Sequence, residues 1–172
     1  MDHLILIIWL LVVLLTAIYL IVPSDAELFG RPVWHEPREI VDYESDGKGT
    51  SQQVLDIYSF SHITHGVLLY FLLRFLGCGV NDGLYVTILM VVMWEIFENT
   101  PFIINRYRRN KEYEHYKGDS IANIIGDIIL VIFGYYLSYK TPTLAILYAA
   151  LSEIVLMCYE ASVIHLSFGS LF

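Results

Sequence analysis

Residues 91–110 read VVMWEIFENTPFIINRYRRN, an apolar run with charged residues inside it. Glu95, Glu98 and Asn99 lie within the run, and a cluster of arginines follows it. An ionisable side chain within a membrane-spanning segment is costly, and it marks a paired or functional position. The stretch therefore raises two linked questions: whether the run spans a bilayer, and what its carboxylates contact.

The composition is typical of a membrane protein. The chain has 172 residues, enough for one domain, and 56% of them are apolar while only 16% are charged. About a quarter of the residues are charged in an ordinary soluble domain. The formal net charge of −8 argues against a nucleic-acid partner, because nucleic acids bind basic surfaces. Cys78 and Cys158 form no CxxC pair, so they offer no metal site of their own.

Five apolar blocks predict an all-α, polytopic transmembrane bundle that forms one integral membrane domain over residues 1–172. The blocks occupy approximately residues 3–22, 60–76, 84–104, 121–139 and 144–159. A helix of about 20 residues crosses the hydrocarbon core of a bilayer. The first block lacks a basic N-terminal flank, so we interpret it as a retained anchor and not as a signal peptide.

The connections between the blocks are of two kinds. GCGVNDG, residues 77–83, is a tight turn and predicts a hairpin of the second and third helices. The loop 23–59 is the one substantial extramembrane segment. Its first half holds three prolines and is predicted to be irregular. Its second half, VDYESDGKGTSQQ at 41–53, is polar and is predicted to be mobile.

Five alternating spans place the polar residues of the blocks in one leaflet. The loop 23–59, the connection 105–118 and the C-terminus share one membrane face. The polar residues near this face are His62, His65, Glu95, Glu98, Asp119, Asn123 and Asp127. Residues three or four apart share a helix face, so each helix should present one polar face. Because facing lipid would be costly, we expect the polar faces to meet, with Gly118 and Gly126 allowing close helix approach.

A membrane-embedded enzyme is the first interpretation of this cluster. Imidazoles and carboxylates supply general acids and bases, and arginines hold phosphate or carboxylate groups. The reaction would be transfer or hydrolysis on a lipid head group or a lipid-linked substrate. The candidate catalytic residues are His62, His65, Glu95, Glu98, Asp119 and Asp127. The candidate substrate-binding residues are Asn99, Arg106, Arg108 and Asn123. A divalent metal is a candidate cofactor, with His62, His65, Glu98 and Asp127 as its ligands.

Two other interpretations stay open. Buried carboxylates and histidines also serve small transporters and proton relays. In a structural or assembly protein, the charges would pair with one another, for example Asp127 with His62 or His65. Asp119 also suits a helix N-cap, and Arg108, Arg109 and Lys111 also suit a positive-inside flank. The expected partners are membrane lipids, together with a second copy of the chain or another membrane protein.

Three motifs resemble those of a known family. They are SQQVLDIYSFSHITHG at 51–66, WEIFENTPFIINRYR at 94–108 and GDSIANIIGD at 118–127. In this order and spacing they resemble an uncharacterised family of small multi-pass bacterial inner-membrane proteins, a domain-of-unknown-function family, over residues 51 to 137. The resemblance implies a multi-pass protein of the bacterial inner membrane and no particular reaction. More loosely, the chain is similar to VanZ-like membrane proteins.

The membrane orientation is left open by the charges. Lysines and arginines are concentrated on the face that carries the polar cluster, which the positive-inside rule places in the cytoplasm. If the arginines around residues 106–117 bind a substrate, the remaining cations no longer distinguish the two faces.

Overall fold

The computed structural model describes residues 41–42, 51–109, 116 and 118–157. The predicted first span, residues 3–22, and the end of the predicted fifth span lie outside the described residues. The described elements are β1 (Val41–Asp42), β2 (Leu55–Asp56), α2 (Ser59–Phe75), α3 (Val80–Glu98), α4 (Pro101–Tyr107), α5 (Ile121–Lys140) and α6 (Pro142–Met157).

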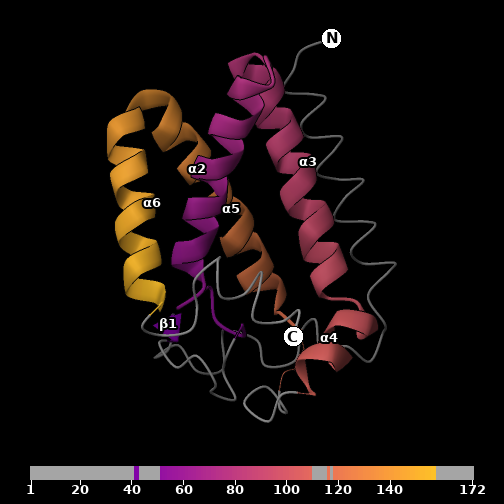
Figure 1. Cartoon of the computed structure of the whole chain (residues 1–172). Helices are drawn as coiled ribbons and strands as arrows, with labels where there is room; N and C mark the ends of the chain where they lie inside the picture. Colours follow the sequence, from indigo (N-terminus) through magenta and orange to yellow (C-terminus); the bar gives the residue numbers. More distant parts are fainter. Residues whose placement is uncertain (1–40, 43–50, 110–115, 117, 158–172) are drawn as a thin grey trace.

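The four longer helices form a bundle of two helical hairpins (Figure 1). The turns between α2 and α3 and between α5 and α6 lie together at one end, here called the turn end. The strands and α4 lie at the opposite end, here called the site end. The predicted hairpin around residues 77–83 is therefore present, with Gly77 in the left-handed region at φ 84°.

The all-α class is confirmed for the described part of the chain. Within it, α3 and α5 are long and apolar enough to cross a membrane, and α6 is apolar but shorter. The structure thus supports two membrane-spanning helices in the described residues, and the five predicted spans stay a prediction. The boundaries of α2 and α5 lie within one residue of the predicted blocks, because each helix begins and ends where its apolar run begins and ends.

The predicted third span, residues 84–104, is wrong as a single helix. α3 begins earlier, at Val80, and ends at Glu98, and a separate helix α4 follows from Pro101. Thr100 is extended, with φ −75° and ψ 149°. Proline pushes the preceding residue out of the helical region and suits the first turn of a new helix, which explains the break. α4 therefore runs at an angle to α3 beneath the bundle (Figure 1).

The segment 41–53, predicted to be mobile, makes specific contacts in its described parts. β1 pairs in parallel with β2, with Val41 opposite Leu55 and Asp42 opposite Asp56. The Ser51 carbonyl accepts a hydrogen bond from the Ser120 N–H at 2.8 Å. The Gln52 carbonyl accepts one from the Ser120 hydroxyl at 3.0 Å. These contacts attach the segment to the start of α5.

The close contact between α2 and α5 occurs at two glycines that the sequence analysis did not single out. A Cβ on Gly66 of α2 would collide with the Val131 carbonyl of α5, and one on Gly134 of α5 would collide with the Ile63 carbonyl of α2. Small residues allow helices to approach in this way. Of the two predicted contact glycines, Gly118 lies against the side chains of Asn99 and Ile104, at the end of α3 and in α4. Gly126 accommodates the carbonyl of Val54, so it packs against the chain before α2 and not against a helix.

An apolar layer crosses the bundle between its two ends. Val91, Val92 and Val131 are buried together, and the half-buried Leu69, Ile96 and Ile128 pack against them. Val91 and Val92 lie about one turn before Glu95 on α3, and Val131 lies one turn after Asp127 on α5. The layer therefore borders the polar cluster on the side of the turn end.

Candidate functional site

Three helices bring one polar side chain each to the same depth at the site end. His62 comes from the first turn of α2, Glu95 from the last turn of α3, and Asp127 from the second turn of α5. All three are buried, and their nearest ligating atoms lie within 4.8 Å of one another. His62 Nε2 is 3.5 Å from Asp127 Oδ2. We call these three residues the histidine triad.

A second group shares Glu95 with the first. Ligating oxygens of Glu95, Glu98 and Asp119 also lie within 4.8 Å of one another, and we call these residues the carboxylate triad. Glu98 is one turn beyond Glu95 on α3, and Asp119 lies just before α5. Glu95 is 1% exposed, which makes it the most deeply buried member. The two triads form one continuous cluster through this side chain.

Asp119 is held by hydrogen bonds from neutral groups. Asn99 Nδ2 donates to Asp119 Oδ2 at 2.8 Å, and the Asp119 N–H donates back to Asn99 Oδ1 at 2.6 Å. The Tyr116 hydroxyl donates to Asp119 Oδ1 at 2.8 Å. The alternative prediction of Asp119 as a helix N-cap is wrong, because Ser120 is the cap and accepts a hydrogen bond from the Asn123 N–H at 3.1 Å.

Tyrosines line the outer side of the carboxylate triad. The Tyr107 hydroxyl donates to Glu98 Oε1 at 3.2 Å, and the rings of Tyr107 and Tyr116 meet edge to face with centroids 5.4 Å apart. Burial, with the nearby charge of Asp119 as a second cause, raises the pKa of Tyr116 well above its ordinary value. Tyr116 therefore stays a hydrogen-bond donor at neutral pH.

Several buried polar atoms of the cluster have no hydrogen-bond partner among the described residues. They are Glu95 Oε1, Asp127 Oδ1 and Asn123 Nδ2. Asp127 is 4% exposed, so its unpartnered oxygen is shielded from solvent. Buried polar atoms in native proteins nearly always have a partner, and an exception calls for a bound ion, water or ligand. The unpartnered atoms make the cluster a candidate binding site.

Asp56 is a buried acid that sequence reasoning did not include among the site residues. It lies in β2, where Asp56 Oδ1 accepts from the Ser59 N–H at 3.0 Å and the Asp56 N–H donates to the Ser59 hydroxyl at 2.9 Å. This reciprocal pair resembles a capping box at the start of α2. Burial, followed by the charge of Asp119, raises the pKa of Asp56 to about 6. The DIYS pattern at 56–59 was the signal that could have identified it.

The remaining predicted site residues lie around the cluster. His65 belongs to neither triad, and its ring lies edge to face with that of His62 at 5.7 Å. Arg108 is exposed, and its Nε donates to the Tyr116 carbonyl at 2.6 Å. Arg106 is half-buried in the last turn of α4. The four predicted metal ligands therefore do not form one group. His62 and Asp127 belong to the histidine triad, Glu98 belongs to the carboxylate triad, and His65 belongs to neither.

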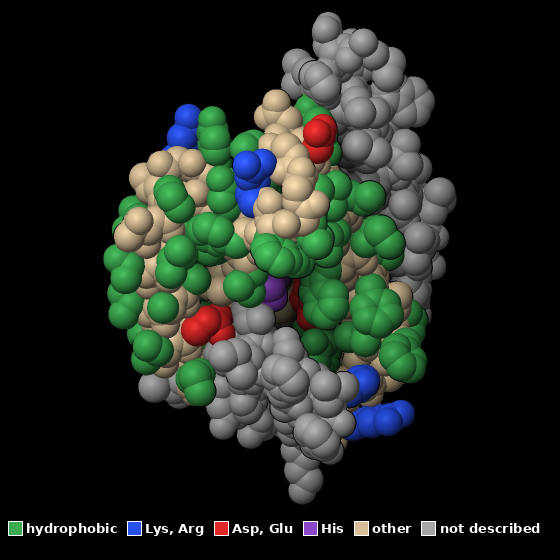
Figure 2. Space-filling view, turned by 45° about the horizontal axis from the view of Figure 1, so that its top comes forward, with side chains coloured by type: hydrophobic (Ala, Val, Ile, Leu, Met, Phe, Trp, Pro, Cys, Tyr) green, Lys and Arg blue, Asp and Glu red, His purple; other side chains and the backbone are tan. Residues whose placement is uncertain are grey.

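The surface of the bundle is hollowed at one place. Figure 2 shows a histidine and an acidic side chain recessed there, below hydrophobic side chains. The arrangement offers an imidazole, four carboxylates and several neutral donors within one small volume. Such a set can bind cations or exchange protons with a bound molecule.

A family model described as "protein of unknown function (DUF2585)" matches residues 27–164, more than half of the chain. The chain belongs to this family. All three motifs that suggested an uncharacterised family lie inside the match, so that prediction is confirmed. The weaker similarity to VanZ-like proteins finds no support in these matches.

Curated relatives of this DUF2585 chain carry the name UPF0314 protein. One from Brucella anthropi is 38% identical over 95 residues, which cover 54% of this chain and 48% of the relative. One from Sphingopyxis alaskensis is 39% identical over 89 residues, covering 49% and 46%. One from Rhizobium etli is 34% identical over 120 residues, covering 65% and 55%. The chain spans about half the length of the curated relatives it matches. No solved structure matches it.

Proposed function

We propose that this chain is a multi-pass inner-membrane enzyme that acts on a lipid or lipid-linked substrate. The observation that carries the proposal is the pair of triads sharing Glu95, buried at one end of an apolar helix bundle with unpartnered carboxylate oxygens. A buried acid cluster of this kind is costly to maintain in a fold. A function that needs the charges accounts for its presence.

The outer surface of the bundle supports a membrane location. Large apolar side chains on every long helix are about half exposed or more, among them Leu72, Met93, Phe133 and Leu151. An exposed apolar surface of this extent is typical of a contact with lipid or protein and not with water. The described helices and the predicted first span would together supply the five predicted spans.

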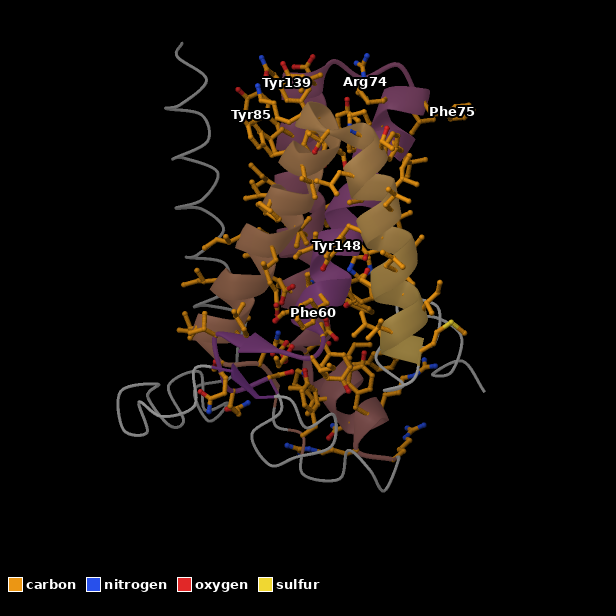
Figure 3. The ribbon with its side chains drawn as sticks, turned by 90° about the vertical axis from the view of Figure 1, so that its left-hand side faces the viewer. Phe60, Arg74, Phe75, Tyr85, Tyr139 and Tyr148 are labelled. Atoms are coloured by element: carbon orange, nitrogen blue, oxygen red, sulfur yellow. The ribbon has the colours of Figure 1, made fainter. Side chains whose placement is uncertain are left out.

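The turn end has the features of a membrane interface. Figure 3 shows Arg74, Tyr85 and Tyr139 near this end. Lys140 Nζ lies 4.8 Å from the centre of the Tyr139 ring and 5.4 Å from that of Tyr136. Tyrosines and basic residues gather where a bilayer meets water. The opposite interface would then lie at α4 and β2, which places the triads at the depth of lipid head groups.

The chemistry of the site suits a head group as substrate. The triads supply acid and base groups, and Arg108 and Arg109 lie exposed at the same end of the molecule. Arginine binds phosphate and carboxylate oxygens through two parallel hydrogen bonds. A phosphate-bearing lipid could therefore enter from the bilayer with its polar part at the site.

The apolar layer favours an enzyme over a transporter. A transport path needs polar or water-filled lining through both leaflets. Val91, Val92 and Val131 instead form a buried apolar cluster about one helical turn from the triads. A site confined to one leaflet is therefore more consistent with an enzyme that acts on a lipid than with a transporter.

The test compares lipids in a bacterial strain that lacks the gene. The strain is complemented with the wild-type chain, with Glu98→Gln, or with Asp82→Asn as a matched control. Asp82 is an exposed acid in the first turn of the same helix, at the turn end. We expect Glu98→Gln to reach the membrane in normal amounts and to leave the lipid or envelope defect uncorrected, whereas Asp82→Asn restores the wild-type profile. A strain complemented fully by both Glu98→Gln and His62→Gln would contradict the enzymatic proposal.

A further inference from the structure

We infer that the two triads form a dinuclear metal centre in which Glu95 bridges two divalent cations of the Mg²⁺ or Mn²⁺ class. One cation lies among His62, Glu95 and Asp127, and the other among Glu95, Glu98 and Asp119. The inference deepens the proposed function, because it names the cofactor of the same site. It nonetheless has a test of its own, since metal content is measured without any lipid assay.

The membership of Glu95 in both triads is the geometric basis. A carboxylate has two oxygens and can bind one ion with each. Glu95 is the residue common to both sets of mutually close ligating atoms. Paired metal ions in proteins lie about 3.5–4 Å apart, a spacing that one shared carboxylate can span. Asp127 belongs to one triad and Glu98 to the other.

The spacing within the histidine triad suits coordination better than hydrogen bonding. His62 Nε2 and Asp127 Oδ2 are 3.5 Å apart, which exceeds the usual length of an N–H···O hydrogen bond. Two atoms that each bind one ion at about 2.1 Å lie roughly 3.0–3.4 Å apart at right or tetrahedral angles. The observed separation is close to this range. Glu95 Oε1 and Asp127 Oδ1, buried and without a partner, are available as further ligand atoms.

The charge of the cluster also calls for cations. Glu95, Glu98, Asp119 and Asp127 carry four negative charges when ionised, and the donors that contact Glu98 and Asp119 include the neutral Tyr107, Asn99 and Tyr116. Buried carboxylates need opposite charges or coordination to a metal. Two divalent cations would neutralise four carboxylates completely.

The ligand types indicate the class of metal. The carboxylate triad is all oxygen, which suits the hard cations Mg²⁺ and Mn²⁺. The histidine triad adds one imidazole, which Mn²⁺ also accepts. Asn99 and Tyr116 are positioning residues, because they hold Asp119 by hydrogen bonds as outer residues do around metal ligands.

The experiment measures metal on the full chain in detergent or lipid nanodiscs. The protein is stripped with chelator, incubated with MnCl₂ and separated from free metal, and bound manganese is then measured by mass spectrometry. We expect about two ions per wild-type chain and about two for Asp82→Asn. Asp119→Asn and His62→Gln should each retain about one, and Glu95→Gln should retain almost none. Electron paramagnetic resonance should show an exchange-coupled manganese pair in wild type, replaced by an isolated-ion signal in Asp119→Asn.

Each result decides the inference. One ion or none on the wild-type chain, or two ions retained by both Asp119→Asn and His62→Gln, would overturn it. If Glu95→Gln does not fold, as judged by gel filtration and circular dichroism, the two single-site variants still decide the question. Two ions combined with an unaltered lipid profile in the complementation test would retain the metal centre and reject the lipid enzyme. A changed lipid profile without bound metal would retain the lipid enzyme and reject the metal centre.

Discussion

Asn99 and Asp119 hold each other through two hydrogen bonds. The side-chain amide of Asn99 donates to Asp119 Oδ2 at 2.8 Å and accepts from the Asp119 backbone N–H at 2.6 Å. Asn99 ends α3, and Asp119 immediately precedes the N-cap of α5. The pair therefore joins two helices that the sequence separates by the whole of α4. It also sets the position of a carboxylate in the cluster.

Asn99→Ala should destabilise the chain and displace Asp119. The change removes three hydrogen bonds, two that the Asn99 amide donates to Asp119 Oδ2 and to the Glu95 carbonyl and one that it accepts from the Asp119 N–H. We expect a loss of about 2–4 kcal/mol in the free energy of unfolding, measured by denaturant titration in detergent. Asn105→Ala, at an exposed position of α4, is the control and should lie near wild type. Equal stability of the two variants would show that the Asn99 contacts contribute nothing.

Gly66→Ala should separate α2 from α5. An added Cβ would collide with the Val131 carbonyl, which is helix backbone and cannot move independently. We expect a cost of about 3 kcal/mol or more, typical of severe overpacking. Because α2 carries His62 and α5 carries Asp127, bound manganese should also fall.

Leu68→Ala is the control for this glycine. Leu68 lies two residues further along the same helix and is 53% exposed, so its truncation removes no buried contact. A thermal midpoint of Gly66→Ala that matches the midpoint of Leu68→Ala would contradict the packing described between the two helices.

Asp56 should make stability depend on pH in a defined window. Its folded pKa of about 6 exceeds the ordinary value of 3.8, so the folded chain binds the proton more tightly than the unfolded chain does. The stability associated with the protonated form is thus fully present below pH 3.8 and is lost as the pH rises through 6. The full difference amounts to about 3 kcal/mol. The free energy of unfolding of the chelated wild-type chain should fall between pH 4 and 7.

Asp56→Asn isolates this contribution, since its amide oxygen can still accept from the Ser59 N–H. Its unfolding free energy should change less over the same window, and the difference between variant and wild type should level off above pH 7. The measurement is denaturant titration at a series of pH values. Parallel pH profiles for the two chains would contradict the raised pKa of Asp56.

The sequence predicted the parts of the fold that depend on local pattern. The bounds of α5 follow from a long, largely apolar run. The alternating topology predicted that His62, Glu95 and Asp127 would lie in the same leaflet, and the three residues do meet. The break before Pro101 was missed because the apolar residues on both sides were interpreted as one block, although the polar residues 98–100 and the proline separate them. The pairing of β1 with β2 was missed because two-residue strands are defined by partners distant in sequence.

The details of the site depend on helix rotation, which the sequence does not specify. His62 and His65 are three residues apart, so they differ by roughly 60° around α2. That rotation is enough to place His62 in a triad and His65 beside it. For the same reason, the sequence showed Glu95 and Glu98 on one face without showing that Glu95 belongs to both triads. Asp56 lies in the first motif but was not assigned to the site, because it belongs to a segment before the helices.

Ser120 and Asp119 allow a direct test of which residue caps α5. Ser120→Ala removes the acceptor for the Asn123 N–H and the donor to the Gln52 carbonyl, so we expect a loss of about 1–2 kcal/mol in unfolding free energy with manganese binding retained. Ser120→Thr keeps the hydroxyl and should largely restore stability. Asp119→Asn should have the opposite signature, with one metal ion lost while the Ser120 cap remains. If Asp119→Asn instead frayed α5 and left the metal content unchanged, Asp119 would be the cap that the sequence alone suggested.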